Sequence, residues 1–182
     1  MIHGYDRLTG EPFASRSEVI GQNGMVATSH PLATQIGLDT LKNGGNAIDA
    51  AIAANIALGL MEPTGNGIGG DLFAIVWRAK DKKLYGLNAS GPAPQDISID
   101  YIKSKGLKKI PSFGPLPVSV PGAVDGWIKL HERFGNIDFE NLFEPTIKYA
   151  QEGFPVTETI AHYFKRSKSR YLDYPNFKET WM

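Results

Sequence analysis

A long apolar helix candidate, joined by a glycine-rich turn to a short apolar strand candidate, constrains the fold more than any other stretch. Residues 46–61, NAIDAAIAANIALGLM, have the length and the alanine and leucine content of a helix. After the turn, LFAIVW at 72–77 has the aromatic and β-branched residues of a strand. The chain therefore combines helices with strands, and the glycines connect a helix to a strand.

The turn contains a G-x-G-x-x-G match at Gly65, Gly67 and Gly70. A dinucleotide site needs a strand before these glycines and a helix after them, because the pyrophosphate sits on the amides at the helix N-terminus. The order here is reversed. Nucleotide binding is thus the weaker hypothesis, and it predicts thermal stabilisation by NAD or ATP.

Upstream of the long helix, the sequence predicts a strand, a helix and a sharp junction. GMVATS at 24–29 is typical of a strand, and Pro31 suits the first position of the helix that follows. Gly44 or Gly45 can take the positive φ of a helix end, and Asn46 is a good N-cap. Asp49, three residues later, faces the free amides, so a structural role is favoured over a catalytic one.

Downstream, LFAIVW and LYGLNAS flank the polar connection RAKDKK, which predicts a β-hairpin inside a larger sheet. GPAPQD at 91–96 ends the hairpin, and the Pro- and Gly-rich segment 101–127 is expected to be an ordered surface segment. Two amphipathic helices are predicted at 123–135 and 139–154, the second with an apolar face made of Leu142, Phe143, Ile147 and Ala150.

Composition excludes several classes of function. The sequence has no cysteine, so disulfides, thiolate zinc sites and cysteine nucleophiles are excluded. Nineteen basic and nineteen acidic residues cancel, which argues against nucleic acid or an anionic membrane as a partner. The basic run KRSKSR at 165–170 is expected to be a solvated helix face. No cofactor is indicated.

The N-terminus lacks the pattern of a signal peptide, so a cytoplasmic location is expected, while a trimmed leader would leave a periplasmic or secreted location open. The long helix falls short of the roughly 20 residues that cross a bilayer. No membrane partner is therefore expected.

No catalytic set is evident from the residues alone. The histidines His3, His30, His131 and His162 lie far apart, and no metal-binding spacing connects them. TSH at 28–30 places a hydroxyl beside an imidazole, but neighbouring residues of a strand point to opposite faces, so adjacency alone does not activate a nucleophile.

Four stretches of the sequence resemble the gamma-glutamyltranspeptidase family, in particular its acylase-like members. They follow one another in the same order as in the family and cover roughly residues 15 to 160. They are GMVATSHPLATQIGLDTLKNGGNAIDAAIAANIALGLMEPTGNGIGGDLFAIVW, VSVPGAVDGW, LHERFG and LFEPTIKYAQEGFPV. The ends, 1–15 and 163–182, resemble the family weakly. Residues 1–182 are interpreted as a single-domain fragment from the N-terminal part of a large subunit.

The resemblance implies an N-terminal-nucleophile hydrolase fold, a four-layer αββα sandwich in which a precursor cuts itself into two subunits. The N-terminal threonine of the small subunit would attack a γ-glutamyl or related acyl amide, with its own amine as base. That threonine is expected downstream of these residues, so this chain alone would be catalytically incomplete. The implied partners are the small subunit, a small-molecule acyl amide and, as an open possibility, further copies of the protein.

One binding residue of the family falls in the covered region. The resemblance implies an Arg-Glu pair after the hairpin, whose arginine binds the α-carboxylate of the substrate. Ser90 stands in the arginine position and Gly91 in the glutamate position. Glutathione-type substrates are therefore expected to be poor, and the alternative is that Ser90 is a plain turn residue.

The resemblance also assigns Gly67, Gly69 and Gly70 to the sheet core, where glycine would permit close backbone approach and unusual φ angles. A non-catalytic binding or structural protein that retains this scaffold is the alternative to the enzyme. The two differ in whether a threonine-rich cleavage site follows in the reading frame.

Overall fold

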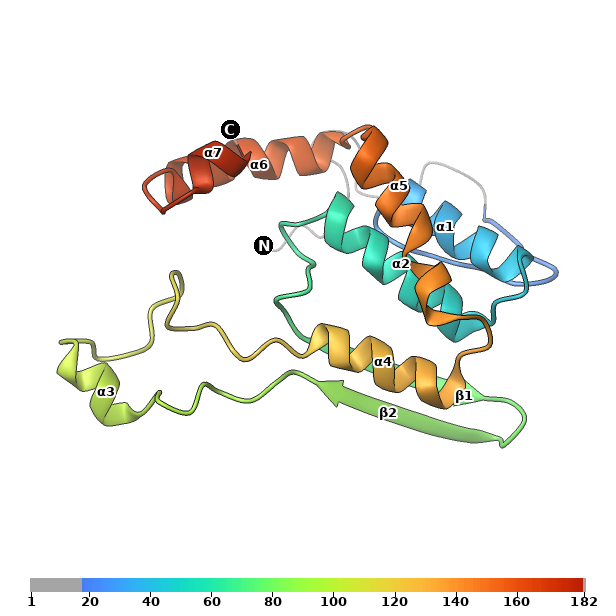
Figure 1. Cartoon of the computed structure of the whole chain (residues 1–182), viewed down its shortest axis with the longest axis horizontal. Coiled ribbons are helices and arrows are strands. Elements are labelled where there is room, and N and C mark those ends of the chain that lie inside the picture. Colours follow the sequence, from blue (N-terminus) through green and yellow to red (C-terminus); the bar gives the residue numbers. More distant parts are fainter. Residues whose placement is uncertain (1–17, 182) are drawn as a thin grey trace. The chain divides into compact units, whose positions relative to one another are not determined.

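The computed structural model describes residues 18–181 as a mixture of helices with a two-stranded antiparallel sheet, which confirms the α+β class (Figure 1). In chain order the elements are α1 (Pro31–Lys42), α2 (Ala47–Met61), β1 (Leu72–Arg78), β2 (Lys83–Ala89), α3 (Ile99–Ser104), α4 (Ala123–Phe134), the 3-10 helix η1 (Phe139–Leu142), α5 (Glu144–Glu152), α6 (Glu158–Tyr171) and α7 (Phe177–Trp181).

These elements form two compact units. The helical unit ends its first segment at Asn66 and resumes at Gly135, so it contains α1, α2, η1 and α5 to α7. The hairpin unit, Gly67–Phe134, contains β1, β2, α3 and α4. The single-domain interpretation of residues 1–182 stays a prediction.

In the helical unit, α1 and α2 lie side by side (Figure 1). A Cβ at Gly37 of α1 would lie 3.3 Å from the Ala50 carbonyl oxygen of α2 and 2.8 Å from Val26 Cγ1, so the glycine allows the close packing. The apolar side chains buried here come mainly from the two helices: Ala33, Ile36, Ala50, Ile52, Ala53, Ala54, Ile56, Ala57 and Met61. The long helix is therefore a core element, as its composition predicts.

The junction between α1 and α2 follows the sequence prediction. Pro31 begins α1, and Gly44 after its end has φ of 95°. Asn46 is the N-cap of α2, and its side-chain oxygen accepts hydrogen bonds from the amides of Ile48 and Asp49 at 2.7 and 3.2 Å.

In the hairpin unit, α4 packs along one face of β1 and β2 (Figure 1). The strands pair antiparallel with Leu72 opposite Ala89 and Val76 opposite Tyr85. A Cβ at Gly126 of α4 would lie 3.0 Å from both Ala89 Cβ and Leu72 Cδ2, so helix and sheet touch closely there. The Gly70 carbonyl oxygen accepts from the amides of Gly122 and Ala123 at 3.0 Å, which ties the start of α4 to the start of β1.

Two local predictions are wrong. Residues 24–29 form no strand in the described structure, because no neighbouring strand pairs with them. The predicted helix 139–154 is divided into η1 and α5, and in α5 Ile147 is 51% exposed whereas Thr146 is buried. By contrast, the segment 101–127 is mostly exposed, as expected, and contains the end of α3 as well as the start of α4.

No helix within residues 18–181 is both long and apolar enough to cross a membrane.

Candidate functional site

Ser90 lies directly after β2, and the chain on both sides of it is fixed by hydrogen bonds. The Ser90 amide donates to Asn88 Oδ1 at 3.0 Å, and the Pro92 carbonyl accepts from the Val120 amide at 2.9 Å. Gly91 has φ of 70°, and a Cβ there would overlap the Val120 carbonyl. A glutamate therefore does not fit at position 91 in this backbone. Ser90 is half-buried and offers a neutral hydroxyl where the family resemblance implies a guanidinium.

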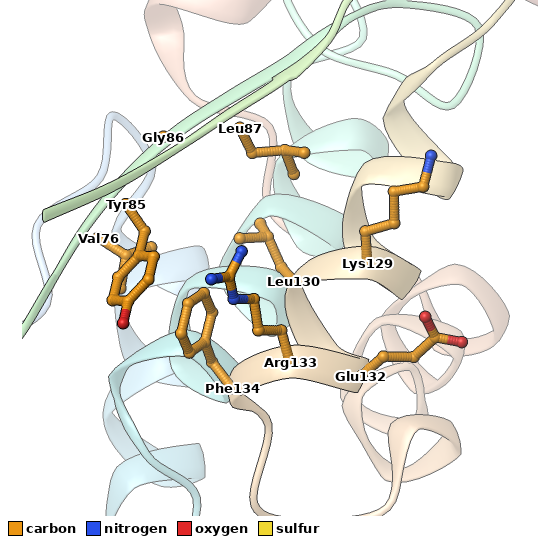
Figure 2. A pocket seen from close by; sticks show the side chains of 9 residues that line it. All are labelled: Val76, Tyr85, Gly86, Leu87, Lys129, Leu130, Glu132, Arg133 and Phe134. Carbon is orange, nitrogen blue, oxygen red and sulfur yellow. The ribbon is translucent and has the colours of Figure 1, made fainter. Parts of the chain in front are cut away.

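A cavity of about 370 Å³ lies between β2 and the end of α4 in the hairpin unit (Figure 2). Arg133 and Phe134 extend from α4 toward Tyr85 of β2, whereas Glu132 points away from them. The Arg133 guanidinium lies 4.5 Å from the centre of the Tyr85 ring and 5.2 Å from that of Phe134. The lining residues are Val76, Tyr85, Gly86, Leu87, Lys129, Leu130, Glu132, Arg133 and Phe134.

Sequence reasoning missed this cavity, and none of the predicted site residues lines it. Its residues come from β1, β2 and the end of α4, elements that are well separated in the sequence. The polar groups of the hairpin end are engaged with one another: Asp81 accepts from Arg78 Nη1 at 2.9 Å and from the Tyr85 hydroxyl at 3.0 Å. These bonds hold the pKa of the Asp81 carboxyl below its ordinary value, with the Tyr85 bond as the largest cause. These bonds lie within the hairpin, whereas the ring contacts of Tyr85 with Arg133 and Phe134 tie it to α4.

A larger open cavity, about 1060 Å³, lies in the helical unit. At its edge Ser29 Oγ donates to Glu62 Oε2 at 2.6 Å. The basic run 165–170 is mostly exposed, as predicted, and it also contributes Arg166, Ser167 and Arg170 to this cavity. The full lining is Ser29, Pro31, Glu62, Pro63, Thr64, Gly65, Thr157, Thr159, Ile160, Tyr163, Phe164, Arg166, Ser167, Arg170, Tyr171, Phe177 and Trp181.

The TSH segment holds no activated nucleophile. Thr28 Oγ1 donates to the His30 carbonyl at 2.7 Å, and the His30 imidazole caps α1 by accepting the Leu32 amide at Nδ1, 3.2 Å away. The Thr28 hydroxyl also shares a hydrogen bond with the Thr34 hydroxyl at 2.8 Å, and Ser29 Oγ bonds to Glu62, so neither hydroxyl is bonded to the imidazole. Burial lowers the pKa of His30, and the nearby charge of Glu62 partly opposes that shift.

The other histidines give no site either. His3 lies outside the described residues, while His131 is in α4 and His162 is in α6. Within residues 18–181, no three His, Asp or Glu side chains converge on a possible metal position.

Asp49 is completely buried at the start of α2. Its Oδ2 accepts from the Asn46 amide at 2.8 Å, which completes a capping box, and both carboxylate oxygens accept from the Asn136 amide at 3.1 Å. The Asn136 side chain in turn donates to the Gly44 carbonyl at 2.8 Å. Asp49 thus joins α2 to the segment before η1, a contact 87 residues away that the sequence does not reveal.

The glycine turn differs from its prediction in one respect. A Cβ at Gly67 or Gly69 would meet no atom within 4 Å, and neither residue has a positive φ. The expected close approach is therefore absent at these two positions among the described residues, because the turn is exposed there. A scaffold role for Gly67 and Gly69 stays a prediction, whereas the Gly70 carbonyl makes the two contacts to α4 described above.

Comparison with known proteins agrees with this architecture. The family model described as Gamma-glutamyltranspeptidase matches residues 33–182. The chain belongs to the gamma-glutamyltranspeptidase family. It is 39% identical over 146 residues to the glutathione hydrolase proenzyme of Bacillus subtilis (strain 168), an overlap that covers 78% of this chain and 25% of the relative. The chain thus spans about a quarter of the length of the curated relatives it matches.

Solved structures of the family share the fold. Cephalosporin acylase from Bacillus halodurans is 50% identical with a TM-score of 0.82, over 88% of this chain and 30% of that one. Helicobacter pylori gamma-glutamyltranspeptidase is 31% identical with a TM-score of 0.82, over 90% of this chain and 47% of that one. The predicted fold class, part of an N-terminal-nucleophile hydrolase, is confirmed.

Proposed function

We propose that these residues belong to the large subunit of a self-cleaving acyl-amide hydrolase or acyltransferase whose threonine nucleophile lies outside residues 1–182. Family membership supports this proposal. Of the two hydroxyls beside His30 in the sequence, that of Thr28 donates to a backbone carbonyl and that of Ser29 to the Glu62 carboxylate, so neither is bonded to the imidazole as an activated nucleophile would be. The small subunit of the same precursor is the partner that would complete the site.

The proposed substrate is an acyl amide without the α-amino-acid head of a γ-glutamyl group. The observation that carries this proposal is Ser90, which replaces the arginine that would bind an α-carboxylate, next to a Gly91 whose backbone leaves no room for a side chain. An arginine fork makes two charge-assisted hydrogen bonds, each roughly twice as strong as a neutral one, and a serine makes one neutral bond. The higher identity to a cephalosporin acylase than to gamma-glutamyltranspeptidase structures, 50% against 31%, points the same way.

A γ-glutamyl substrate is the second candidate, because a curated relative named glutathione hydrolase proenzyme is 39% identical. In that case another group supplies the missing positive charge. Homo-oligomerisation and a cytoplasmic location are further proposals.

The test uses the full-length gene product that contains these residues. Its mass pattern shows whether it cleaves into two chains, and turnover of a γ-glutamyl anilide and a simple acyl anilide is measured side by side. Two chains with preference for the acyl anilide are expected. Strong γ-glutamyl turnover would refute the substrate proposal, and an uncleaved, inactive product would favour the non-catalytic alternative.

A Ser90→Arg variant tests the role of position 90. It should raise the ratio of γ-glutamyl to acyl turnover by about tenfold, the effect of roughly 1.4 kcal/mol in the transition state. Ser104→Arg is the matched control, because Ser104 is exposed at the end of α3. An equal change of the ratio in both variants would refute a specific role for position 90.

A further inference from the structure

His30 is an unusual helix cap because it can change its charge near neutral pH. It is 1% exposed, and its Nδ1 accepts the Leu32 amide at 3.2 Å as the N-cap of α1. An imidazole nitrogen that accepts carries no proton, so the ring is neutral and its proton is on Nε2. The common caps Ser, Thr, Asp and Asn keep an acceptor oxygen across this pH range.

Protonation removes this cap. The imidazolium carries an N–H on both nitrogens, so Nδ1 no longer accepts the Leu32 amide. The new positive charge would also lie at the positive end of the α1 dipole. The first turn of α1 contains no acidic residue that would offset it.

The groups packed around His30 decide where a protonated ring can go. From α2, the charge that acts on it is Glu62, the residue after the helix, whose carboxylate accepts from Ser29 Oγ at 2.6 Å. From the segment after α5, the neutral Phe154 ring lies edge-on with centroids 6.4 Å apart. His30 Nε2 is buried without a hydrogen-bond partner in residues 18–181. The cap is therefore the one hydrogen bond of the neutral ring within residues 18–181, and Glu62 is the counter-charge available to a protonated ring.

We propose that His30 is an acid-sensitive switch: protonation breaks the cap of α1 and turns the charged ring toward the Glu62 carboxylate. The step takes up one proton from solvent at Nδ1 and breaks one hydrogen bond. Burial holds the pKa of folded His30 below its ordinary value of 6.5. The stability that comes from the neutral cap is therefore fully present above pH 6.5 and is lost as the pH falls below it. Since Glu62 lies three residues before Gly65, the first residue of the G-x-G-x-x-G match, the switch links pH to the start of that segment.

Hydrogen exchange of the full-length gene product tests the switch. Protection of the α1 first-turn amides is followed from about pH 7.5 downward in a series of steps below pH 6.5, after correction for the intrinsic exchange rate, with the first turn of α2 as internal reference. A loss of about fivefold or more, confined to α1, is expected from the removal of one cap. His30→Asn keeps an acceptor that does not titrate and should abolish the loss. His162→Asn, a change of an exposed histidine in α6, should leave the loss as it is.

Two further measurements keep the proposal open to refutation. Glu62→Gln removes the counter-charge and should move the midpoint of the loss of α1 protection to lower pH. An unchanged midpoint would refute the role of Glu62 as the counter-charge of the protonated ring. If His30→Asn does not fold, NMR of isotope-labelled histidines in the unmutated protein follows the ring directly. A His30 ring that titrates while α1 stays fully protected, or that has its proton on Nδ1 at neutral pH, would overturn the switch.

Discussion

Replacement of Asp49 by alanine should destabilise the helical unit by about 3 kcal/mol. The change removes the carboxylate half of the α2 capping box, worth about 1 kcal/mol. It also takes away the acceptor of the Asn136 amide, a part-buried hydrogen bond to a charged group, and such bonds contribute about 1.5–3 kcal/mol. Asp49→Asn keeps one acceptor oxygen and should lose about half as much.

The assay is urea unfolding of the full-length gene product, followed by circular dichroism. At a slope of about 3 kcal/mol per M, the loss for Asp49→Ala corresponds to a midpoint about 1 M lower. Asp125→Asn is the matched control, since Asp125 is exposed and its ion pair with Lys129 should contribute less than about 1 kcal/mol. A midpoint for Asp49→Ala within the range of the control would refute the structural role. Normal stability with lost activity would instead support a catalytic role.

Three further changes test the hairpin unit. Gly122→Ala should cost about 1–3 kcal/mol in thermal or urea unfolding, because its Cβ overlaps the Ala89 carbonyl; Gly65→Ala, where a Cβ meets no atom within 4 Å, should be nearly neutral. Gly69→Val should impair folding or maturation if the scaffold role implied by the family resemblance is right, and normal cleavage into two chains would count against that role. Trp77→Ser should reduce the binding of a hydrophobic dye by the isolated 182-residue product, since the Trp77 side chain is 62% exposed; unchanged dye binding would mean that Trp77 is already covered.

Local chemistry made α1, α2 and the hairpin predictable. Pro31 and Asn46 mark helix starts through backbone rules that act over one turn, and the polar connection after β1 marks a reversal of the chain. The strand predicted at 24–29 fails because a strand needs a neighbour, which its own sequence does not specify. The predicted helix 139–154 fails at Pro145, which begins α5 at its first turn and leaves the preceding residues as a 3-10 turn.

The candidate site was less predictable because its contacts are remote in the sequence. Ser90 could be singled out only through the family resemblance, and one of the two hydrogen bonds that fix its surroundings comes from Val120, 30 residues later. Burial of His30 could not be read from the sequence, since a histidine before Pro31 is equally compatible with an exposed cap. The cavity beside Arg133 needed the register of β1 and β2 as well as the direction of α4.

The hairpin explains why the sequence pointed to a larger sheet than these residues contain. A strand with one solvated face alternates apolar and polar residues, whereas LFAIVW is apolar at every position. The structure uses Leu72, Ala74 and Val76 on the side of α4, and it leaves Phe73, Ile75 and Trp77 between 62% and 80% exposed on the other. Leu84, opposite Trp77, extends the same exposed row. Burial of that row would bring the favourable free energy of about 1.5–3 kcal/mol for each large side chain. The continuous apolar pattern thus indicates that both faces of the hairpin become buried. Within residues 67–134, α4 buries one of these faces.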